Sequence, residues 1–384
     1  VVTGYNIWGF DYEYIYERTK ILIENTNESL DEILNISRVK TGNENGYIHS
    51  DSFYDKEKVY NVKQLSSSAM GDNILKFFNT TGRVNIDLLK YVRDNKKLSM
   101  YKLDFVAEKF LGQKKNPVTP NDIFNWYHEG KKEKITEIAK YCIQDCKLVN
   151  KLINKMSVIE NSIGMANTCW VPINYIFTRG QGIKAHSLVL KECSELGYIV
   201  PHKDRNGDRG NFKGATVLTA KSGIHYYPVS ALDFASLYPS SMISHNLCIS
   251  SFISEESLNE HIKKYKWTVD KYRKVEWDED GVVKKYFYVQ PDKVDGKIVE
   301  EDRAVLPQIL LKLLNKRNET KKRMKKETDS FKKSILDGLQ LAYKVTANSV
   351  YGQLGSAVGP IGKVEVAASI TTTGRQLLEL AQDF

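Results

Sequence analysis

The sequence has no uninterrupted apolar run that approaches the roughly 18 residues needed to span a lipid bilayer. Its first residues also lack the charged-then-apolar pattern of a secretion signal. The five cysteines are odd in number and scattered, with no C-x-x-C pair, which argues against a disulfide framework and against a zinc site. These absences predict a soluble protein of a reducing intracellular compartment, without a membrane partner.

What the sequence does have is apolar content and positive charge. With 384 residues and 41% hydrophobic content, the chain is long enough for two or three cores and too apolar for wholesale disorder. Its 56 Lys and Arg against 47 Asp and Glu give a formal charge of +9, which favours a polyanionic partner. A basic protein without such a partner would show the same balance, so charge alone does not identify the function.

No internal repeat or low-complexity block divides the chain, so its organisation is inferred from changes of pattern. Helical stretches alternate with loops up to about residue 165, which is typical of an α/β unit. A helical run, a Gly-rich basic loop over 202–215 and two strand candidates over 214–220 and 224–234 follow. The sequence therefore predicts a mixed α/β and α+β protein with several domains.

The C-terminal half changes character twice. Residues 249–302 are charged and contain the turn signals DEDG and VDGK between aromatic runs, which predicts a solvent-facing hairpin. Between residues 307 and 351, two long helical patterns follow each other, separated by ETDS.

The segment from Asp233 to Ser240, DFASLYPS, places a carboxylate where an apolar run ends. We expect Asp233 at the end of a strand, followed by a turn in which Pro239 directs the chain away from that strand. A single Asp at such a place is usually only a turn former. Here Tyr238 and the hydroxyls of Ser236 and Ser240 lie close to it in the sequence, which argues for a functional site instead of a turn alone.

DFASLYPS resembles the A motif of family B DNA polymerases over all eight residues. The resemblance implies that Asp233 and the backbone carbonyl of Phe234 hold two Mg²⁺ ions, which clamp the attacking and leaving oxygens in phosphoryl transfer. Oxygen ligands are those that Mg²⁺ prefers. The resemblance also implies that Tyr238 is a steric gate against ribonucleotides, and that Ser236 and Leu237 bind the incoming nucleotide.

The first of the two long helical patterns carries Arg317, Lys321 and Lys325 at spacing i, i+4, i+8. Like charges so placed destabilise an isolated helix by a few tenths of a kcal/mol per pair, roughly, which favours an anion among them. A solvated basic face is the alternative. If the two helices pack antiparallel with a turn near 328–330, Arg317 lies about 17 Å and Lys344 about 20 Å from that turn. These cations would then meet at one level.

The second helical pattern places Lys344, Asn348 and Tyr351 on one face, and we expect Gly352 to end the helix. KVTANSVYG resembles the family's B motif, K-x-x-x-N-S-x-Y-G, with every fixed position filled. The resemblance implies a catalytic role for Lys344 and contacts of Tyr351 and Gly352 with DNA at the nascent base pair. It also implies that the triphosphate is bound by Arg317, Lys321, Lys344 and Asn348.

Near the start of the chain, GYNIWGFDYEYI joins an apolar segment to Asn6 and Asp11, and YCIQDCKLV places Tyr141 and Asp145 on one helical face. Together these segments resemble two exonuclease motifs of the same family, N-x-x-x-F-D and Y-x-x-x-D. The resemblance implies that Asp11 and Asp145 are catalytic metal ligands, that Tyr141 orients the attacking water, and that Asn6 contacts DNA. Asp87 is interpreted as structural.

FKGA resembles the family's link between its two halves, with Phe212 in place of a Tyr and Gly214 as a DNA contact. Two family motifs are absent from these residues: the exonuclease Asp-x-Glu, expected before Val1, and the C motif, Tyr-x-Asp-Thr-Asp-Ser. The chain is therefore identified as a fragment of a delta-type member, similar to those of large double-stranded DNA viruses of eukaryotes. As given, we expect it to polymerise little or not at all.

The resemblance implies five regions. They are a partial ribonuclease H-like 3′-to-5′ exonuclease domain (1–165), a connecting segment (166–230), the first part of the palm with a charged hairpin (231–304), a helical-hairpin fingers domain (305–352) and a return to the palm (353–384).

The function implied for the whole protein is DNA-directed DNA synthesis with proofreading, in viral or other replication. Its partners would be primer-template DNA and deoxynucleoside triphosphates, and whether a sliding clamp is a further partner stays open. If the protein is viral, it would act in the host nucleus or at a cytoplasmic replication site. An exonuclease-only protein, a non-catalytic DNA-binding relative and a protein-primed polymerase are the alternatives.

Overall fold

The structure is a computed structural model that describes residues 1–24, 26, 36, 38, 60–67, 71–78, 80, 82–200, 212–219, 222–230, 232–279, 281–356 and 361–383. Most of the Gly-rich loop expected over 202–215 lies outside these residues. The chain forms two compact units. Unit 1 is Val1–Ala166 with Pro172–Gly180, and unit 2 is Asn167–Val171 with Gln181–Phe384.

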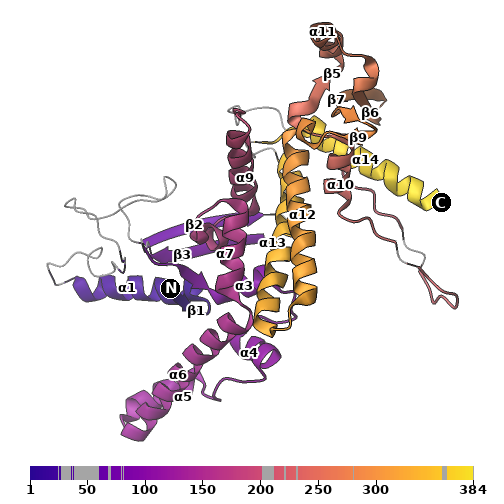
Figure 1. Cartoon of the computed structure of the whole chain (residues 1–384). Coiled ribbons are helices and arrows are strands. Elements are labelled where there is room, and N and C mark those ends of the chain that lie inside the picture. The colour runs from indigo at the N-terminus through magenta and orange to yellow at the C-terminus, as the bar shows by residue number, and fades with distance from the viewer. Residues whose placement is uncertain are drawn as a thin grey trace. The chain divides into compact units, whose positions relative to one another are not determined.

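Unit 1 combines strands with helices (Figure 1). Its strands are β1 (Val2–Gly4), β2 (Tyr60–Ser67), β3 (Gly71–Phe78) and β4 (Asn85–Asp87). Its helices are η1 (Ile7–Asp11), α1 (Tyr12–Ile23), α3 (Leu88–Asn95), α4 (Leu103–Leu111), α5 (Pro120–Glu129), α6 (Lys132–Lys155), most of α7 (Val158–Cys169) and α8 (Ile173–Thr178). β1 pairs parallel with β4, and β2 pairs antiparallel with β3.

The side chain of Asp87 connects three parts of unit 1. It accepts hydrogen bonds from the backbone N–H groups of Asn6 (2.9 Å) and Trp8 (3.0 Å), and it caps α3 through the N–H of Leu89 (3.0 Å). The carboxyl is buried, and burial raises the pKa of Asp87 against the opposing effect of these bonds. The structural interpretation of Asp87 is confirmed.

Unit 2 contains the long helical hairpin and a small sheet (Figure 1). Its helices are α9 (Gln181–Glu195), α10 (Leu237–His245), η2 (Ile249–Ser251), α11 (Glu255–Tyr265), η3 (Val269–Lys271), η4 (Glu300–Asp302), α12 (Val305–Lys326), α13 (Ser330–Leu354) and α14 (Val364–Asp383). Its strands are β5 (Phe252–Ser254), β6 (Tyr272–Glu279), β7 (Val282–Val289), β8 (Lys293–Val294) and β9 (Lys297–Ile298). The predicted mixed α/β, multi-domain class is confirmed.

α12 and α13 form the predicted hairpin. α12 ends at Lys326, and Asp329 begins α13 by accepting hydrogen bonds from the N–H groups of Phe331 (2.8 Å) and Lys332 (3.0 Å). The expectation that Gly352 ends α13 is wrong. The helix continues to Leu354, whose side chain is fully buried in the core of unit 2 and draws the last turn inward past the glycine.

The charged segment is only partly the solvent-facing hairpin that the sequence predicts. β6 and β7 pair antiparallel and β5 adds to β7, so the turn signals are correct. However, Tyr288 is fully buried and its hydroxyl donates to the Ser369 Oγ of α14 at 2.8 Å. One face of this sheet therefore belongs to the core, and α11 within the segment was not predicted.

The strands expected over 214–220 and 224–234 are wrong for the residues that the structure describes there, which contain no strand. A strand needs a neighbour to complete its backbone hydrogen bonds, and none of the described strands pairs with either segment. The apolar side chains of Tyr226, Val229 and Leu232 are consequently exposed.

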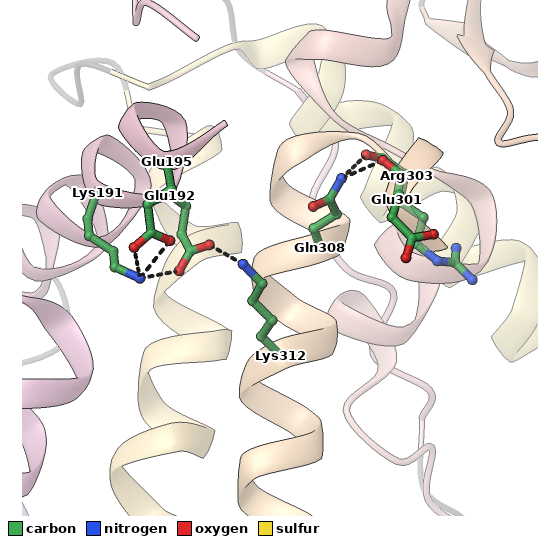
Figure 2. Close-up of polar contacts among 7 residues, drawn as sticks. All are labelled: Lys191, Glu192, Glu195, Glu301, Arg303, Gln308 and Lys312. Atoms are coloured by element: carbon green, nitrogen blue, oxygen red, sulfur yellow. Dashed lines mark hydrogen bonds and ion pairs between the residues drawn. The ribbon is translucent and has the colours of Figure 1, made fainter. Parts of the chain in front are cut away.

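The first turns of α12 are anchored by polar contacts (Figure 2). Lys312 Nζ donates to Oε2 of the buried Glu192 of α9 at 2.5 Å, and Lys191 contacts the same carboxylate at 3.0 Å. Gln308 Nε2 donates to the carbonyl oxygens of Glu301 (3.0 Å) and Arg303 (2.6 Å). The hairpin is therefore fixed at the end opposite its turn.

No helix in the described residues is both long enough and apolar enough to cross a lipid bilayer.

Candidate active sites

A sharp turn at Ser236 organises the segment that contains Asp233. Ser236 has left-handed backbone angles, φ 57° and ψ 60°, and precedes α10. The Ser240 hydroxyl donates to the Ala235 carbonyl oxygen at 2.7 Å, which closes the turn. Pro239 lies in the first turn of α10, where its missing N–H leaves no helical bond unmade. The predicted turn exists, but the described residues before it form no strand, and Pro239 takes part in a helix.

Asp233 is exposed. No group of three His, Cys, Asp or Glu side chains that could hold a metal ion occurs among these residues. One carboxylate and one backbone carbonyl supply only part of the oxygen ligands that Mg²⁺ requires. The described residues therefore do not by themselves complete a metal site at Asp233.

The ring of Tyr238 in α10 stacks on the ring of Tyr351 in α13, with centroids 4.4 Å apart. Burial, and then the nearby Tyr238, raise the pKa of Tyr351 to about 12, so this phenol stays neutral at physiological pH. A Cβ added to Gly374 of α14 would lie 3.0 Å from Cε1 of Tyr238. The absence of a side chain at Gly374 thus leaves room for the ring.

The cations of the hairpin lie on α12 and α13. Arg317 and Lys321 are half-buried, whereas Lys344 and Asn348 are exposed. Arg317 Nε donates to Oε1 of Gln340 at 3.2 Å, and Gln340 lies one helical turn before Lys344 on α13. This contact agrees with the expected common level of Arg317 and Lys344. The arrangement can neutralise a multiply charged anion.

The segment FKGA is held by α14. Arg375 Nη1 donates to the carbonyl oxygens of Lys213 (2.9 Å) and Gly214 (2.8 Å), and the Thr371 hydroxyl donates to that of Lys213 (3.1 Å). The Phe212 ring lies against Gly355, where an added Cβ would be 3.1 Å away. Gly214 is exposed and has open space around its Cα. The backbone at Gly214 is thus fixed while remaining accessible.

In unit 1, a cavity of about 1280 Å³ is lined by Asn6, Asp11 and Asp145, among other residues. The structure therefore brings these three predicted residues together. Tyr141 is one turn from Asp145 on α6, as predicted, but it does not line the cavity. The predicted site residues of the polymerase motifs, Gly352 and Lys344 among them, belong to unit 2.

Lys115 links the two predicted residues of α6. Its Nζ contacts Asp145 Oδ2 at 2.7 Å and donates to the Tyr141 hydroxyl at 2.8 Å. Burial lowers the pKa of Lys115, but its bonds to Asp145 and Tyr141 outweigh that effect and raise the pKa overall. Lys115 therefore remains charged and fixes both side chains.

The chemistry of the cavity fits a hard cation. Oδ1 of Asp145 is buried and has no hydrogen-bond partner among the described residues, so it keeps its lone pairs for a ligand. Burial raises the pKa of Asp11, the second carboxylate, because it disfavours the charged form. The carboxylates of Asp11 and Asp145 offer oxygen atoms of the type that Mg²⁺ prefers, but in the described residues they do not form a group of three possible ligands.

Asn6 has a strained backbone conformation that its surroundings maintain. Its φ is +66°, and Asp87 accepts a hydrogen bond from its N–H. A Cβ on Gly9 would lie only 2.4 Å from the Asn6 Oδ1 atom. Because Gly9 has no side chain, the amide of Asn6 can lie against the Gly9 backbone. Asn6 lines the cavity.

Sequence reasoning missed Lys115 and Arg375. Lys115 lies in a loop after α4. Arg375 lies in α14, far along the sequence from the segment that it contacts. Neither has a local periodic signal, because each acts on residues that are distant in the chain.

The fold of this chain is similar to that of a solved structure, the family B DNA polymerase from the hyperthermophilic archaeon Pyrobaculum calidifontis. It covers 100% of this chain with a TM-score of 0.64 at 22% identity, and the matched part is 43% of that protein. At the level of sequence, the profile of DNA polymerase family B matches residues 171–384, and that of the family's exonuclease domain matches residues 1–106. This chain belongs to DNA polymerase family B.

Named relatives agree with the predicted delta-type and viral resemblance. The DNA polymerase of Pyramimonas orientalis virus is 34% identical over 100% of this chain and 39% of its own length. The DNA polymerase delta catalytic subunit of Caenorhabditis elegans is 33% identical over 100% of this chain and 31% of its own length. The chain thus spans about a third of the length of these relatives.

Proposed function

We propose that this chain is part of a DNA-directed DNA polymerase with 3′-to-5′ proofreading, which extends a primer with deoxynucleotides in viral or other replicative synthesis. The observation that carries the proposal is the stack of Tyr238 on Tyr351, which joins two polymerase motifs in one place. The five proposed regions are the exonuclease domain (1–165), the connecting segment (166–230), the first part of the palm (231–304), the fingers (305–352) and the return to the palm (353–384).

In the polymerase half, the proposed role of the hairpin is to bind the incoming triphosphate. Arg317 and Lys321 on α12 and Lys344 on α13 would neutralise its charge, with Asn348 beside them. The Tyr238 ring, backed by Tyr351, would lie under the sugar with Ser236 and Leu237 and exclude a 2′-hydroxyl.

Asp233 and the Phe234 carbonyl are proposed ligands of the two Mg²⁺ ions of this half. Because no group of three possible metal ligands includes Asp233 in the described residues, the nucleotide contacts carry this part of the proposal. For the same reason, we propose that these 384 residues alone extend a primer little or not at all.

In the exonuclease half, Asp11 and Asp145 would hold Mg²⁺ through the unpartnered Oδ1 of Asp145. When bound, the metal would activate water and stabilise the charge that develops on the phosphate. Lys115 holds Tyr141, which would orient the attacking water, and Asn6 would contact the 3′ end of the DNA.

The proposed partners are primer-template DNA, which Tyr351, Gly352 and Gly214 would contact, and deoxynucleoside triphosphates. A sliding clamp is a further proposed partner. We place the protein inside the cell, at the host nucleus or a cytoplasmic replication site if it is viral.

A second candidate is a protein in which only the exonuclease half is active. The specific observation in its favour is that two carboxylates, Asp11 and Asp145, line one cavity, and that Oδ1 of Asp145 has no hydrogen-bond partner in the described residues. The two candidates make opposite predictions for primer extension.

The test uses full-length protein with a labelled primer-template that ends in a mismatch. The double variant Asp11→Ala with Asp145→Ala should extend a matched primer normally but no longer trim the mismatched end. Persistent trimming by the purified double variant refutes the exonuclease assignment. Trimming without any extension by the unmodified protein supports the exonuclease-only candidate.

A further inference from the structure

An aromatic cluster lies where α11 ends and β6 begins, and none of the motifs above includes it. It consists of His261, Tyr265, Trp267 and Tyr272. The Tyr265 and Trp267 rings stack with centroids 4.9 Å apart and planes at 23°. The His261 ring is 4.5 Å from that of Tyr265, and its Nδ1 shares a 2.8 Å hydrogen bond with the Tyr272 hydroxyl. The rings therefore support one another, and Tyr265 remains 44% exposed.

Lysines surround this aromatic cluster. Lys264 Nζ lies 5.2 Å from the centre of the Tyr265 ring, and Lys271 Nζ lies 5.4 Å from that of Trp267. Residues 261–274 contain six Lys or Arg and a single acidic residue, whereas residues 275–302 contain four Lys and nine acidic residues. Positive charge is thus concentrated around the rings, and the rest of the segment would repel a polyanion.

Part of this pattern has a structural explanation. Lys263 and Lys264 lie in the last turn of α11, where cations stabilise the helix dipole. Lys271 and Lys274 form ion pairs with Asp292 and Glu276, which DNA phosphates would have to replace. Neither explanation covers Lys266, which follows the helix, or the stacked rings. Aromatic rings interleaved with exposed lysines are the features that bind single-stranded nucleic acid without sequence preference.

We propose that the aromatic cluster and its lysines form a binding surface for single-stranded DNA. A base would stack on the exposed Tyr265 ring, and Lys264 would exchange its ring contact for a phosphate. The inference rests on the proposed function, because a template that is being copied presents an unpaired strand. Figure 1 shows α11 and β5–β7 at the end of α12 opposite the hairpin turn, so this surface is distinct from the proposed triphosphate contacts.

The test measures binding of fluorescein-labelled oligo(dT) to full-length protein by anisotropy, without Mg²⁺ or nucleotide. Tyr265→Ala should weaken binding about fivefold or more, the effect of losing one base stack, while Tyr265→Phe should keep it because the ring remains. The matched control is Tyr127→Ala on α5, where a ring that is 71% exposed is removed outside the cluster. It should leave binding unchanged.

Photocrosslinking identifies the surface directly. Oligonucleotide that contains 5-bromodeoxyuridine should crosslink to a peptide from residues 261–274, and the crosslink should be lost in Tyr265→Ala. Unchanged affinity of Tyr265→Ala, an equal loss in Tyr127→Ala, or the absence of a crosslink in this peptide overturns the proposal and leaves the surface to a protein partner. Primer extension is measured on the same preparations, so normal extension with no crosslink refutes this inference alone.

Discussion

Tyr238 and Tyr351 are 113 positions apart in the sequence, yet their rings stack at 4.4 Å with an interplanar angle of 23°. The contact connects α10, which follows Asp233, with the end of α13. Gly374 of α14 adjoins the same Tyr238 ring. Three helices of unit 2 therefore meet at the residue that is proposed to select the sugar.

The first prediction concerns the energy of this stack. An aromatic pair contributes about 0.5–1.5 kcal/mol beyond the area that it buries. A double-mutant cycle of Tyr238→Ala and Tyr351→Ala, followed by urea unfolding, should yield a coupling energy of that size. A cycle of Tyr238→Ala with Tyr265→Ala serves as the control and should yield none. Strictly additive effects of the first pair would contradict the observed contact.

The second prediction concerns Gly374. Its replacement by Ala places a methyl group 3.0 Å from the Tyr238 ring, which must then shift. Gly374→Ala should therefore change the ratio of ribonucleotide to deoxynucleotide incorporation in single-nucleotide extension assays. Gly180→Ala is the control because a Cβ there meets open space. An unchanged ratio in Gly374→Ala would show that the ring position does not set sugar selection.

The third prediction is that Lys115, but not the adjacent Lys114, is needed for mismatch trimming. Lys115→Met removes two hydrogen bonds to Asp145 and Tyr141, and a bond to a charged group is worth about 1.5–3 kcal/mol. We expect mismatch trimming to slow by about tenfold or more, with matched primer extension unaffected.

Lys114→Met is the matched control for Lys115. Lys114 is adjacent in the sequence but pairs with Glu108, and neither residue lines the cavity. Trimming should be normal in this variant. Equal trimming by the two methionine variants would remove Lys115 from the proposed site.

The fourth prediction concerns pH. Burial, followed by the charge of Arg273, lowers the pKa of His245 from 6.5 to about 4. The unfolded chain then binds a proton that the folded chain does not, so the stability that the neutral imidazole contributes is present above pH 6.5 and is lost as pH falls towards 4. His245→Gln should flatten that part of the curve of unfolding free energy against pH. His128→Gln, on the exposed surface of α5, should leave it unchanged.

The helical hairpin could be predicted from the sequence because its signals are local. Apolar periodicity and the capping Asp329 define α12, α13 and the turn, and the spacing of Tyr141 and Asp145 places both on one face of α6. The failed predictions depended on packing. Gly352 is a poor helix residue, but the burial of Leu354 extends α13 past it.

The candidate sites could be predicted only in part for the same reason. Motif spacing identified Asp11 and Asp145, and the cavity that they share agrees with it. Lys115 and Arg375 act across long stretches of chain, so no periodic pattern could reveal them. The strand expected before Asp233 depends on a pairing partner, which local sequence does not specify.

The central claim is that Asp233 is a catalytic metal ligand of a polymerase, and primer extension by the full-length protein with Mg²⁺ tests it most directly. Asp233→Asn should abolish extension while binding of the primer-template persists. Asp295→Asn should extend normally, since that residue lies in the exposed turn between β8 and β9. Undiminished extension by Asp233→Asn would contradict the account.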